Sequence, residues 1–215
     1  MPHAARRAEA TRDAIRAAAE ALFAERGFME TRLEDVAERV GIRRASLLYH
    51  FPSKVELYGA VFESMLEDLR MRAVEARRQP APHGEMIDRL LGVWVRFVFE
   101  RPAFVRLLMR EMSGTRAIPT GTFARLALPV MAETMAVVRD GNARGDFQGV
   151  GAMDFVLTIA GASVFKLLLG PIVAPETHGG PTDTTMLAHD RELRHLARLL
   201  LGTAAETPTG EESYA

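Results

Sequence analysis

Basic side chains gather in one short part of this 215-residue chain. In residues 41–60 the only acid is Glu56, and the other charged or titratable groups apart from tyrosine are Arg43, Arg44, His50 and Lys54. Guanidinium and ammonium groups bind phosphates, and an arginine can also donate two hydrogen bonds to the edge of a guanine. The cluster therefore indicates binding to nucleic acid. The net charge of −1 argues against such a partner for the chain as a whole, but not for a local patch.

Two short helices joined by a tight turn are predicted to hold these side chains. Thr31 and Glu34 have the spacing of a capping box, which begins a helix. Apolar residues then recur on one helical face: Leu33, Val36, Ala37 and Val40. Gly41 ends this helix, and a second helix is predicted from about residue 44 to 51, before Pro52. Helix, glycine turn and short helix form a helix-turn-helix, whose second helix lies in the DNA major groove.

The same residues resemble the TetR family of bacterial transcriptional regulators. The family's order of glycine, an aliphatic residue, a small residue, leucine, His-Phe and lysine is found here from Gly41 to Lys54. By motif, the resemblance covers residues 8–60. It implies that three residues of the second helix face the groove of double-stranded operator DNA: Arg44, Ser46 and Tyr49.

The resemblance also assigns contacts to single residues. Arg44 is the expected guanine contact. Phosphate contacts are expected from Arg43, Tyr49, His50 and Lys54, with the hydroxyl and backbone of Thr31 adding another at a helix N-terminus. Three positions depart from the family pattern: Arg43, Ala45 and Leu48 stand where serine or threonine, glycine and tyrosine are usual. The phosphate contact of that tyrosine is either absent or made by Tyr49, whose alternative role is a half-buried ring packed on the first helix.

The rest of the chain continues in helical periodicity, and no strand pattern occurs. The predicted fold is all-α, with about nine helices in two domains: an N-terminal helix-turn-helix three-helix domain and a C-terminal helical ligand-binding and dimerisation domain. The predicted division is a flexible arm (1–7), the DNA-binding domain (8–60, with the motif at about 32–51), the C-terminal domain (61–201) and a disordered acidic tail (202–215).

Aromatic and methionine side chains are frequent in the C-terminal part. Methionine fills irregular space and repacks easily, which suits a pocket for an apolar or amphipathic small-molecule effector. The candidate pocket residues are Trp94, Phe97, Phe104, Met109, Met112, Phe123, Met131 and Met135. The alternative is that these residues form an ordinary helix core. By resemblance, effector binding moves the helix predicted from residue 54 to 78 and changes the spacing of two DNA-binding domains.

Two helices near the C-terminus are candidates for a homodimer interface, residues 152–169 and 186–201. The first is apolar almost all round and contains small residues that allow close approach. The candidate interface residues are Phe155, Ile159, Ala162, Ser163, Leu193, Leu196 and Leu200. The alternative is a core buried within one subunit. By resemblance these helices form a four-helix bundle, and a two-fold dimer predicts a near-palindromic operator.

Several classes of protein are excluded by what the sequence lacks. There is no cysteine, the six histidines have no metal-ligand spacing, and no nucleophile-elbow or phosphate-binding motif occurs. We therefore expect no enzyme, no metal and no cofactor. The N-terminus has no apolar signal region, and the apolar run of residues 155–165 is too short to span a bilayer, so we expect a cytoplasmic protein without a membrane partner.

The sequence thus predicts a ligand-responsive DNA-binding transcriptional regulator that binds a palindromic operator as a dimer. The preferred form is a repressor that a small effector releases from DNA. Two alternatives stay open: a transcriptional activator, and a helical small-molecule-binding protein whose DNA binding is lost or altered.

Overall fold

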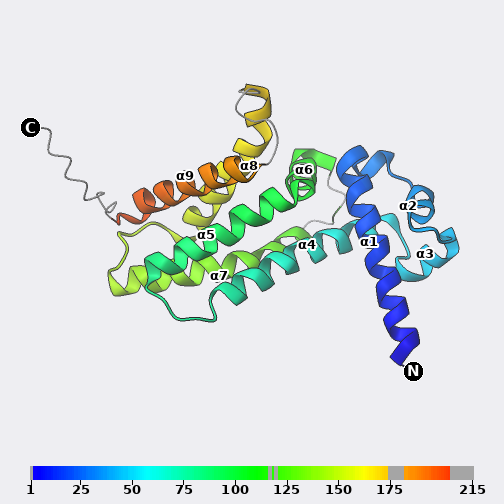
Figure 1. Ribbon diagram of the computed structural model, residues 1–215, viewed down its shortest axis with the longest axis horizontal. Coiled ribbons are helices and arrows are strands. Elements are labelled where there is room, and N and C mark those ends of the chain that lie inside the picture. The colour runs from blue at the N-terminus through cyan, green and yellow to red at the C-terminus, as the bar shows by residue number, and fades with distance from the viewer. Residues whose placement is uncertain (1, 116–117, 119–120, 174–181, 204–215) are drawn as a thin grey trace, which may run out of the picture. The chain divides into compact units, whose positions relative to one another are not determined.

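The computed structural model describes residues 2–115, 118, 121–173 and 182–203, and every regular element in them is helical. The α-helices, shown in Figure 1, are α1 (Pro2–Glu30), α2 (Leu33–Val40), α3 (Arg44–His50), α4 (Lys54–Ala76), α5 (His83–Glu100), α6 (Pro102–Arg110), α7 (Thr122–Arg144), α8 (Ala152–Val173) and α9 (Asp183–Leu201). A short π-helical segment, η1 (Glu111–Thr115), continues α6. The predicted all-α fold of about nine helices is confirmed over this part of the chain.

The chain forms two compact units. The first consists of Met1–Glu75 and Arg96–Met131, and the second of Ala76–Val95 and Ala132–Ala215. This division differs from the one expected between residues 60 and 61, because nearly all of α4 belongs to the first unit. Helices α5 and α7 contribute residues to both units. The disordered tail expected over 202–215 lies, from residue 204 on, outside the described residues.

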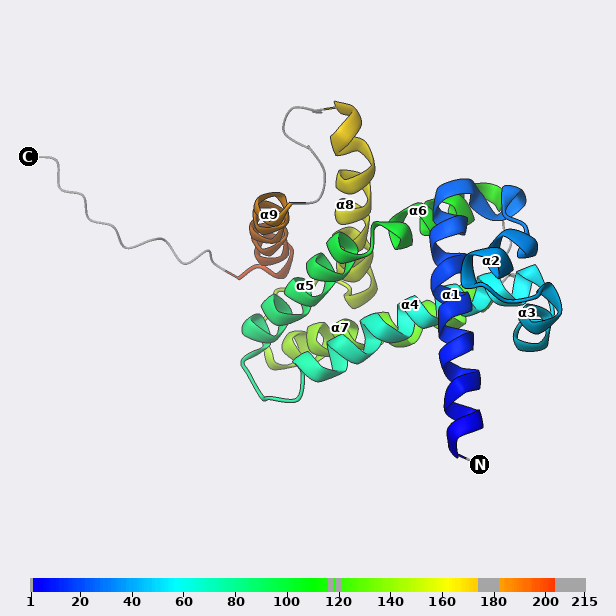
Figure 2. The same cartoon turned by 45° about the vertical axis from the view of Figure 1, so that its right-hand side comes forward.

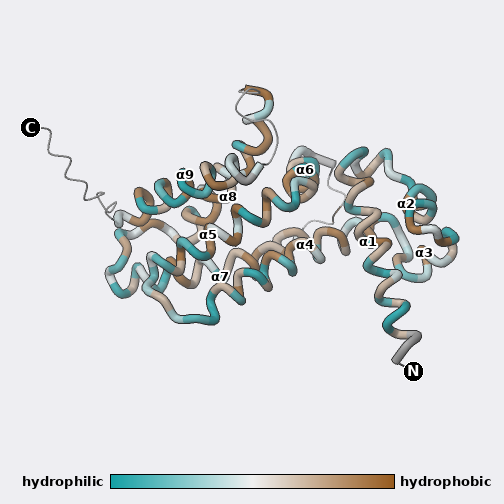
Figure 3. The backbone as a smooth tube through the Cα atoms, in the orientation of Figure 1, coloured by the Kyte–Doolittle hydropathy of each residue, from teal (hydrophilic) through white to brown (hydrophobic). Residues whose placement is uncertain are grey.

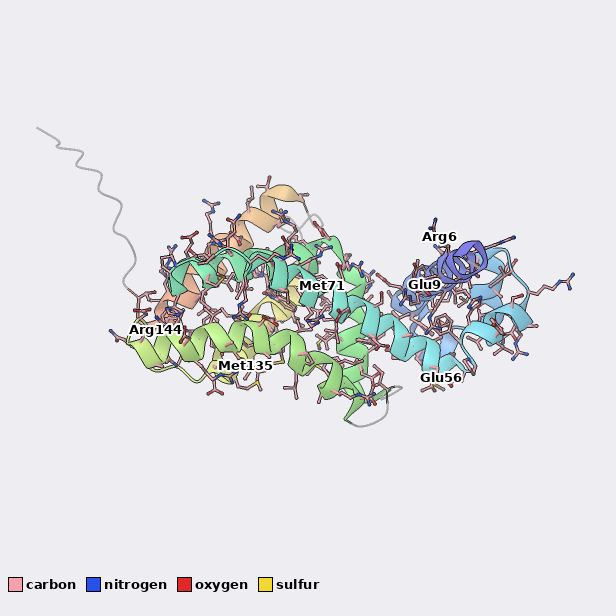
Figure 4. All side chains as sticks on the ribbon, turned by 90° about the horizontal axis from the view of Figure 1, so that it is seen from below. Arg6, Glu9, Glu56, Met71, Met135 and Arg144 are labelled. Carbon is pink, nitrogen blue, oxygen red and sulfur yellow. The ribbon has the colours of Figure 1, made fainter. Side chains whose placement is uncertain are left out.

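Helix α1 begins at Pro2, so the flexible arm expected over residues 1–7 is instead helical from its second residue. Proline suits a first helical turn, and the alanines and arginines that follow favour helix. Figure 2 shows the N-terminal turns of α1 extending away from α2 and α3. Arg6 and Glu9, both exposed, lie on these turns (Figure 4).

Gly27 interrupts α1 near its end. Its backbone angles, φ 88° and ψ 173°, lie in a region that glycine adopts far more readily than other residues. A Cβ atom at this position would also collide with the guanidinium of Arg110, which packs over the break from the end of α6. The backbone conformation therefore favours glycine here, whereas the flexible Arg110 side chain can shift to make room.

Two side chains satisfy the main-chain carbonyls around this break. The hydroxyl of Thr31, which is fully buried, donates to the carbonyl of Gly27 at 2.7 Å. The ammonium of Lys54, at the start of α4, donates to three carbonyls, those of Phe28 (2.8 Å), Met29 (3.3 Å) and Thr31 (3.1 Å). The same nitrogen lies 4.4 Å from the centre of the Phe28 ring. These contacts hold the start of α4 against the end of α1.

Aromatic rings fill the interior beside this junction. The ring of Tyr58 on α4 makes edge-to-face contacts with Phe23 (4.9 Å between centroids), Phe28 (5.1 Å) and Phe62 (5.3 Å). Phe62 in turn contacts Phe123 at 6.0 Å. Such pairs add to the free energy gained by burial, so the cluster fastens α1, α4 and the start of α7 within the first unit.

The ends of α2 agree only in part with the sequence. Gly41 ends the helix as predicted, in the left-handed conformation with φ 74°. The capping box expected from Thr31 and Glu34 is absent: the N-cap is Arg32, and no side chain caps it. The prediction was wrong because the Thr31 hydroxyl turns inward to the carbonyls of α1.

In the second unit, Ser163 joins three helices. This residue lies within α8 and is fully buried. Its hydroxyl donates to the carbonyl of Ile159, so its oxygen accepts from Nε1 of Trp94 on α5 (2.9 Å) and from Nε2 of His189 on α9 (3.1 Å). Burial, assisted by the charge of Lys166, lowers the pKa of His189 to about 4. The imidazole is therefore neutral, with its proton on Nε2.

Helix α8 is apolar over most of its 22 residues, as the brown colour in Figure 3 shows. Among the helices in the described residues, α8 alone is long and apolar enough to cross a membrane. Within its most apolar 18 residues, 17% are buried inside the protein. The apolar run expected at residues 155–165 is thus part of a longer helix. This is weak evidence for a membrane, since core helices of other proteins have the same composition, and Lys166 of α8 is paired with Glu192 of α9.

A histidine between two carboxylates joins α5 to the end of α7. His83 Nε2 lies 2.8 Å from Oδ2 of Asp140, and Nδ1 lies 2.5 Å from Oδ2 of Asp146 in the turn after α7. Both nitrogens can donate only when the ring is protonated. The hydrogen bonds to Asp140 and then Asp146 accordingly raise the pKa of His83. Arg144, at the end of α7 in Figure 4, lies 3.4 Å from Asp140 and balances its charge.

We expect Lys54→Met to lower the free energy of unfolding by about 1–3 kcal/mol, because three main-chain carbonyls, two of them in part-buried bonds, would lose a charged donor. Chemical denaturation measures this value. The control is Arg43→Met, which removes the same charge from an exposed side chain of the same motif and should change stability by less than about 0.5 kcal/mol. Equal losses in the two variants would contradict the internal role of Lys54.

His83 should make stability depend on pH. Its pKa in the folded protein is raised above the usual 6.5, so its contribution is fully present below about pH 6.5 and is lost as pH rises through the folded value. Thermal melts recorded at increasing pH above 6 should therefore show a larger fall in melting temperature for the wild type than for His83→Gln. His195→Gln, which alters an exposed histidine of α9, should follow the wild type. Parallel curves for wild type and His83→Gln would rule out this coupling.

Candidate nucleic-acid interface

Helices α2 and α3 bury one face and expose the other. The buried side chains are Leu33, Val36, Ala37 and Leu47. The exposed side chains of the turn and of α3 are Arg43, Arg44, Ala45, Ser46 and Tyr49. The three residues predicted to face a DNA groove, Arg44, Ser46 and Tyr49, are thus all at the surface.

Tyr49 has 83% of its surface exposed and contacts the ring of His50 edge-to-face at 5.4 Å. The alternative of a half-buried ring packed on the first helix is therefore wrong. His50 itself is half-buried, and its carbonyl accepts a hydrogen bond from Nη1 of Arg12 on α1 at 3.3 Å. The guanidinium of Arg12 also lies 4.6 Å from the centre of the Phe51 ring. Arg12 thus anchors the end of α3, a role that the spacing of residues within the motif did not reveal.

One predicted phosphate contact is contradicted by this geometry. The Thr31 hydroxyl is fully buried and bonded to main-chain carbonyls, so it cannot reach DNA; a contact from the Thr31 backbone stays a prediction. Lys54 is half-buried, and its ammonium donates to three main-chain carbonyls in the protein without DNA. Its contact with a phosphate stays a prediction, and its bonds within the protein help to hold the frame on which α3 is mounted.

Arg44 has an acidic neighbour that the sequence did not single out. Its Nε lies 2.7 Å from Oε1 of Glu34 on α2, and both side chains are more than half exposed. The next acid, Asp35, pairs instead with Arg26 of α1 at 3.0 Å, which ties α2 to α1. A tight turn alone does not predict this pair, because Glu34 lies in the first turn of α2, at the end of the helix away from the turn.

The candidate pocket residues do not share one environment. Trp94 and Met135 belong to the second unit, and the other six belong to the first. Phe97 and Phe104 are buried, and their ring centroids lie 5.1 Å apart. These two residues fit the alternative, an ordinary helix core. Met112 is 71% exposed.

An open surface pocket of about 690 Å³ lies elsewhere in the first unit, between α1 and the segment of Glu100 and α6. Alanines of α1 form part of its lining, together with charged residues such as Glu20, Arg106 and Arg110. None of the eight candidate pocket residues lines it. Their role in effector binding stays a prediction.

The candidate dimer residues are mostly on the wrong side of their helices. Phe155, Ile159, Ser163 and Leu193 are buried within one subunit and cannot face a second copy. Ala162, Leu196 and Leu200 are half-buried. The exposed apolar residues of α8 and α9 are instead Leu157, Phe165, Leu169, Ile172, Val173, Leu187 and Leu199. An almost uniformly apolar helix gives no sequence signal of which face is inside.

Comparison with known proteins identifies both parts of the chain. The family described as "Bacterial regulatory proteins, tetR family" matches residues 15–61. The family described as "Tetracyclin repressor-like, C-terminal domain" matches residues 84–196. The chain is 38% identical over 95 residues to the HTH-type transcriptional regulator TtgR of Pseudomonas putida, covering 43% of this chain and 45% of that protein. It is 35% identical over 107 residues to the HTH-type transcriptional regulator RutR of Escherichia coli, covering 50% of each. The chain spans about half the length of these curated relatives.

The fold is also that of solved structures. A regulatory protein of the tetR family from Rhodococcus RHA1 superposes with a TM-score of 0.74, covering 91% of this chain and 98% of that one at 18% identity. At this identity the likeness shows the fold alone. These proteins are regulators rather than enzymes, as the sequence predicted for this chain. Since the C-terminal model alone matches more than half of the 215 residues, and the N-terminal model matches the helix-turn-helix, the chain belongs to the tetR family of bacterial regulatory proteins.

Proposed function

We propose that this protein is a ligand-responsive transcriptional repressor that binds a near-palindromic operator as a homodimer in the cytoplasm. The main support is the exposed face of the turn and α3. Arg43 and Arg44 offer guanidinium groups there, Ser46 and Tyr49 offer hydroxyls, and Leu47 on the opposite face anchors the helix in the core. A short helix with such a face suits readout of base edges in a major groove, with phosphate contacts beside it.

Exposed apolar side chains support the dimer. Phe165 (59% exposed), Ile172 (75%) and Leu199 (66%) lie on α8 and α9, where a single copy leaves them in water. Covering such a surface with the same surface of a second copy removes apolar area from water and closes a two-fold interface. Two copies then present two helix-turn-helix motifs to one DNA, which is why a near-palindromic site is expected.

An effector is proposed for the C-terminal part because the family model matched there is the tetracycline repressor-like C-terminal domain. Within the first unit, the partly exposed apolar residues Met109, Phe123 and Met131 are the remaining candidates for contact with it. Their chemistry favours an apolar or amphipathic molecule. Release from DNA on effector binding would make the protein a repressor.

Selection from a randomised duplex pool tests DNA recognition with the full chain. We expect the wild type to enrich an inverted repeat and to bind it more weakly as salt rises. Arg44→Ala should reduce discrimination at one base pair of each half-site by about 5- to 100-fold. Arg39→Ala, which removes an exposed arginine of α2, should keep the base preference. A wild type without any base preference at low salt would favour a helical protein that has lost DNA binding.

The oligomeric state tests the proposed interface. We expect Phe165→Asp to be monomeric in sedimentation velocity, because two carboxylates would be buried in a two-fold interface. Its affinity for the inverted repeat should fall about 100-fold, since the second motif would no longer bind as part of the same molecule. The control is Met71→Asp on α4, which changes another exposed apolar residue (50% exposed; Figure 4) and should remain dimeric. A monomeric wild type would contradict the proposal.

A further inference from the structure

We infer that Glu34 of α2 is a positioning residue that sets the base specificity of Arg44. The inference rests on the proposed function, because it concerns how the same surface reads DNA. It starts from the ion pair between Nε of Arg44 and Oε1 of Glu34, 2.7 Å apart. This pair joins the first turn of α2 to the first residue of α3 across the tight turn.

The atom that makes the contact matters. Guanine recognition requires two parallel donors, which the terminal nitrogens Nη1 and Nη2 of an arginine supply as a fork. Glu34 forms an ion pair with Arg44 at Nε, at the base of the guanidinium, and its carboxylate does not occupy the terminal nitrogens. The attraction between the two charges can therefore keep the guanidinium close to the first turn of α2 while the fork remains available to a base. An arginine without such support turns about its flexible side chain and must be ordered when it binds.

The charge of Glu34 adds selectivity. A carboxylate beside Arg44 partly cancels its attraction for phosphates, which are the same in every sequence. A guanine edge offers two acceptors without a formal charge, so the carboxylate opposes that contact less. Glu34 thereby weakens the general attraction to DNA more than the contact with one base.

The neighbouring acids do not share this position. Asp35 is held by Arg26 within the packing of α1 and α2. Glu38 lies one turn further along α2 and is exposed. Glu38 is therefore a matched control: Glu38→Gln removes the same charge from the same helix and leaves the Arg44 contact in place.

The experiment compares full-length wild type, Glu34→Gln, Glu38→Gln, Arg44→Ala and the double variant Glu34→Gln/Arg44→Ala. Each binds the enriched inverted repeat and a panel of duplexes that carry every single base change in one half-site. We expect Glu34→Gln to reduce discrimination about fivefold or more at the base pair that Arg44 reads, and to raise affinity for unrelated DNA. Glu38→Gln should keep the base preference, and Glu34→Gln should have no further effect on it once Arg44 is alanine.

A wild type with a clear preference that Glu34→Gln keeps unchanged at every position would overturn the inference and leave the proposed function intact. The same holds if Glu34→Gln flattens the preference equally in the presence and absence of Arg44. A wild type that shows no base preference would overturn the proposed function, and this inference with it. Circular dichroism melts of each variant confirm that a change in preference does not arise from unfolding.

Discussion

The satisfaction of a few main-chain carbonyls around Gly27 is the constraint on which the first unit depends. The break in α1 leaves carbonyls without helical partners, and a nearby donor stabilises them. Lys54 donates to three carbonyls that lie 23 to 26 residues before it in the sequence, and the hydroxyl of Thr31 donates to the carbonyl of Gly27. These contacts fix where α4 begins and how α2 leaves α1. The exposed face of α3 therefore depends on two side chains that point away from it.

Bonding to main-chain carbonyls also occupies some of the positive side chains near α3. Arg12 and Lys54 flank α3, but their charged groups are bonded to carbonyls and lie over aromatic rings. At the surface Arg44 is next to a carboxylate, so the motif presents less positive charge than a count of its residues suggests. Weak general attraction makes base contacts a larger share of the binding energy. It also means that, under the proposed function, two copies are needed for firm binding.

Sequence patterns predicted the elements better than the contacts of single residues. Glycine at residue 41 could be interpreted correctly because helix ends depend on local backbone geometry. The role of Thr31 could not be predicted in this way. Its hydroxyl could either cap α2 or donate to a carbonyl of α1, and the break at Gly27 favours the second. Lys54 resembled a phosphate contact by motif, whereas its carbonyl partners lie beyond any local pattern. The pairing of Glu34 with Arg44 joins two helices and likewise needs their geometry.

Helix α8 is apolar on both its buried and its exposed sides. Its buried side contains Phe155 and Ile159 and also Ser163, which is bonded to Trp94 and His189. Large apolar side chains such as Phe165 and Ile172 are exposed. A hydroxyl with a donor from each of two neighbouring helices fixes their register, because any shift would leave buried polar groups unpaired. The outward face has no such requirement and gains free energy only when something apolar covers it. A helix whose register is fixed by polar contacts at Ser163 and whose exposed side is apolar is suited to pack on a second copy without losing that register.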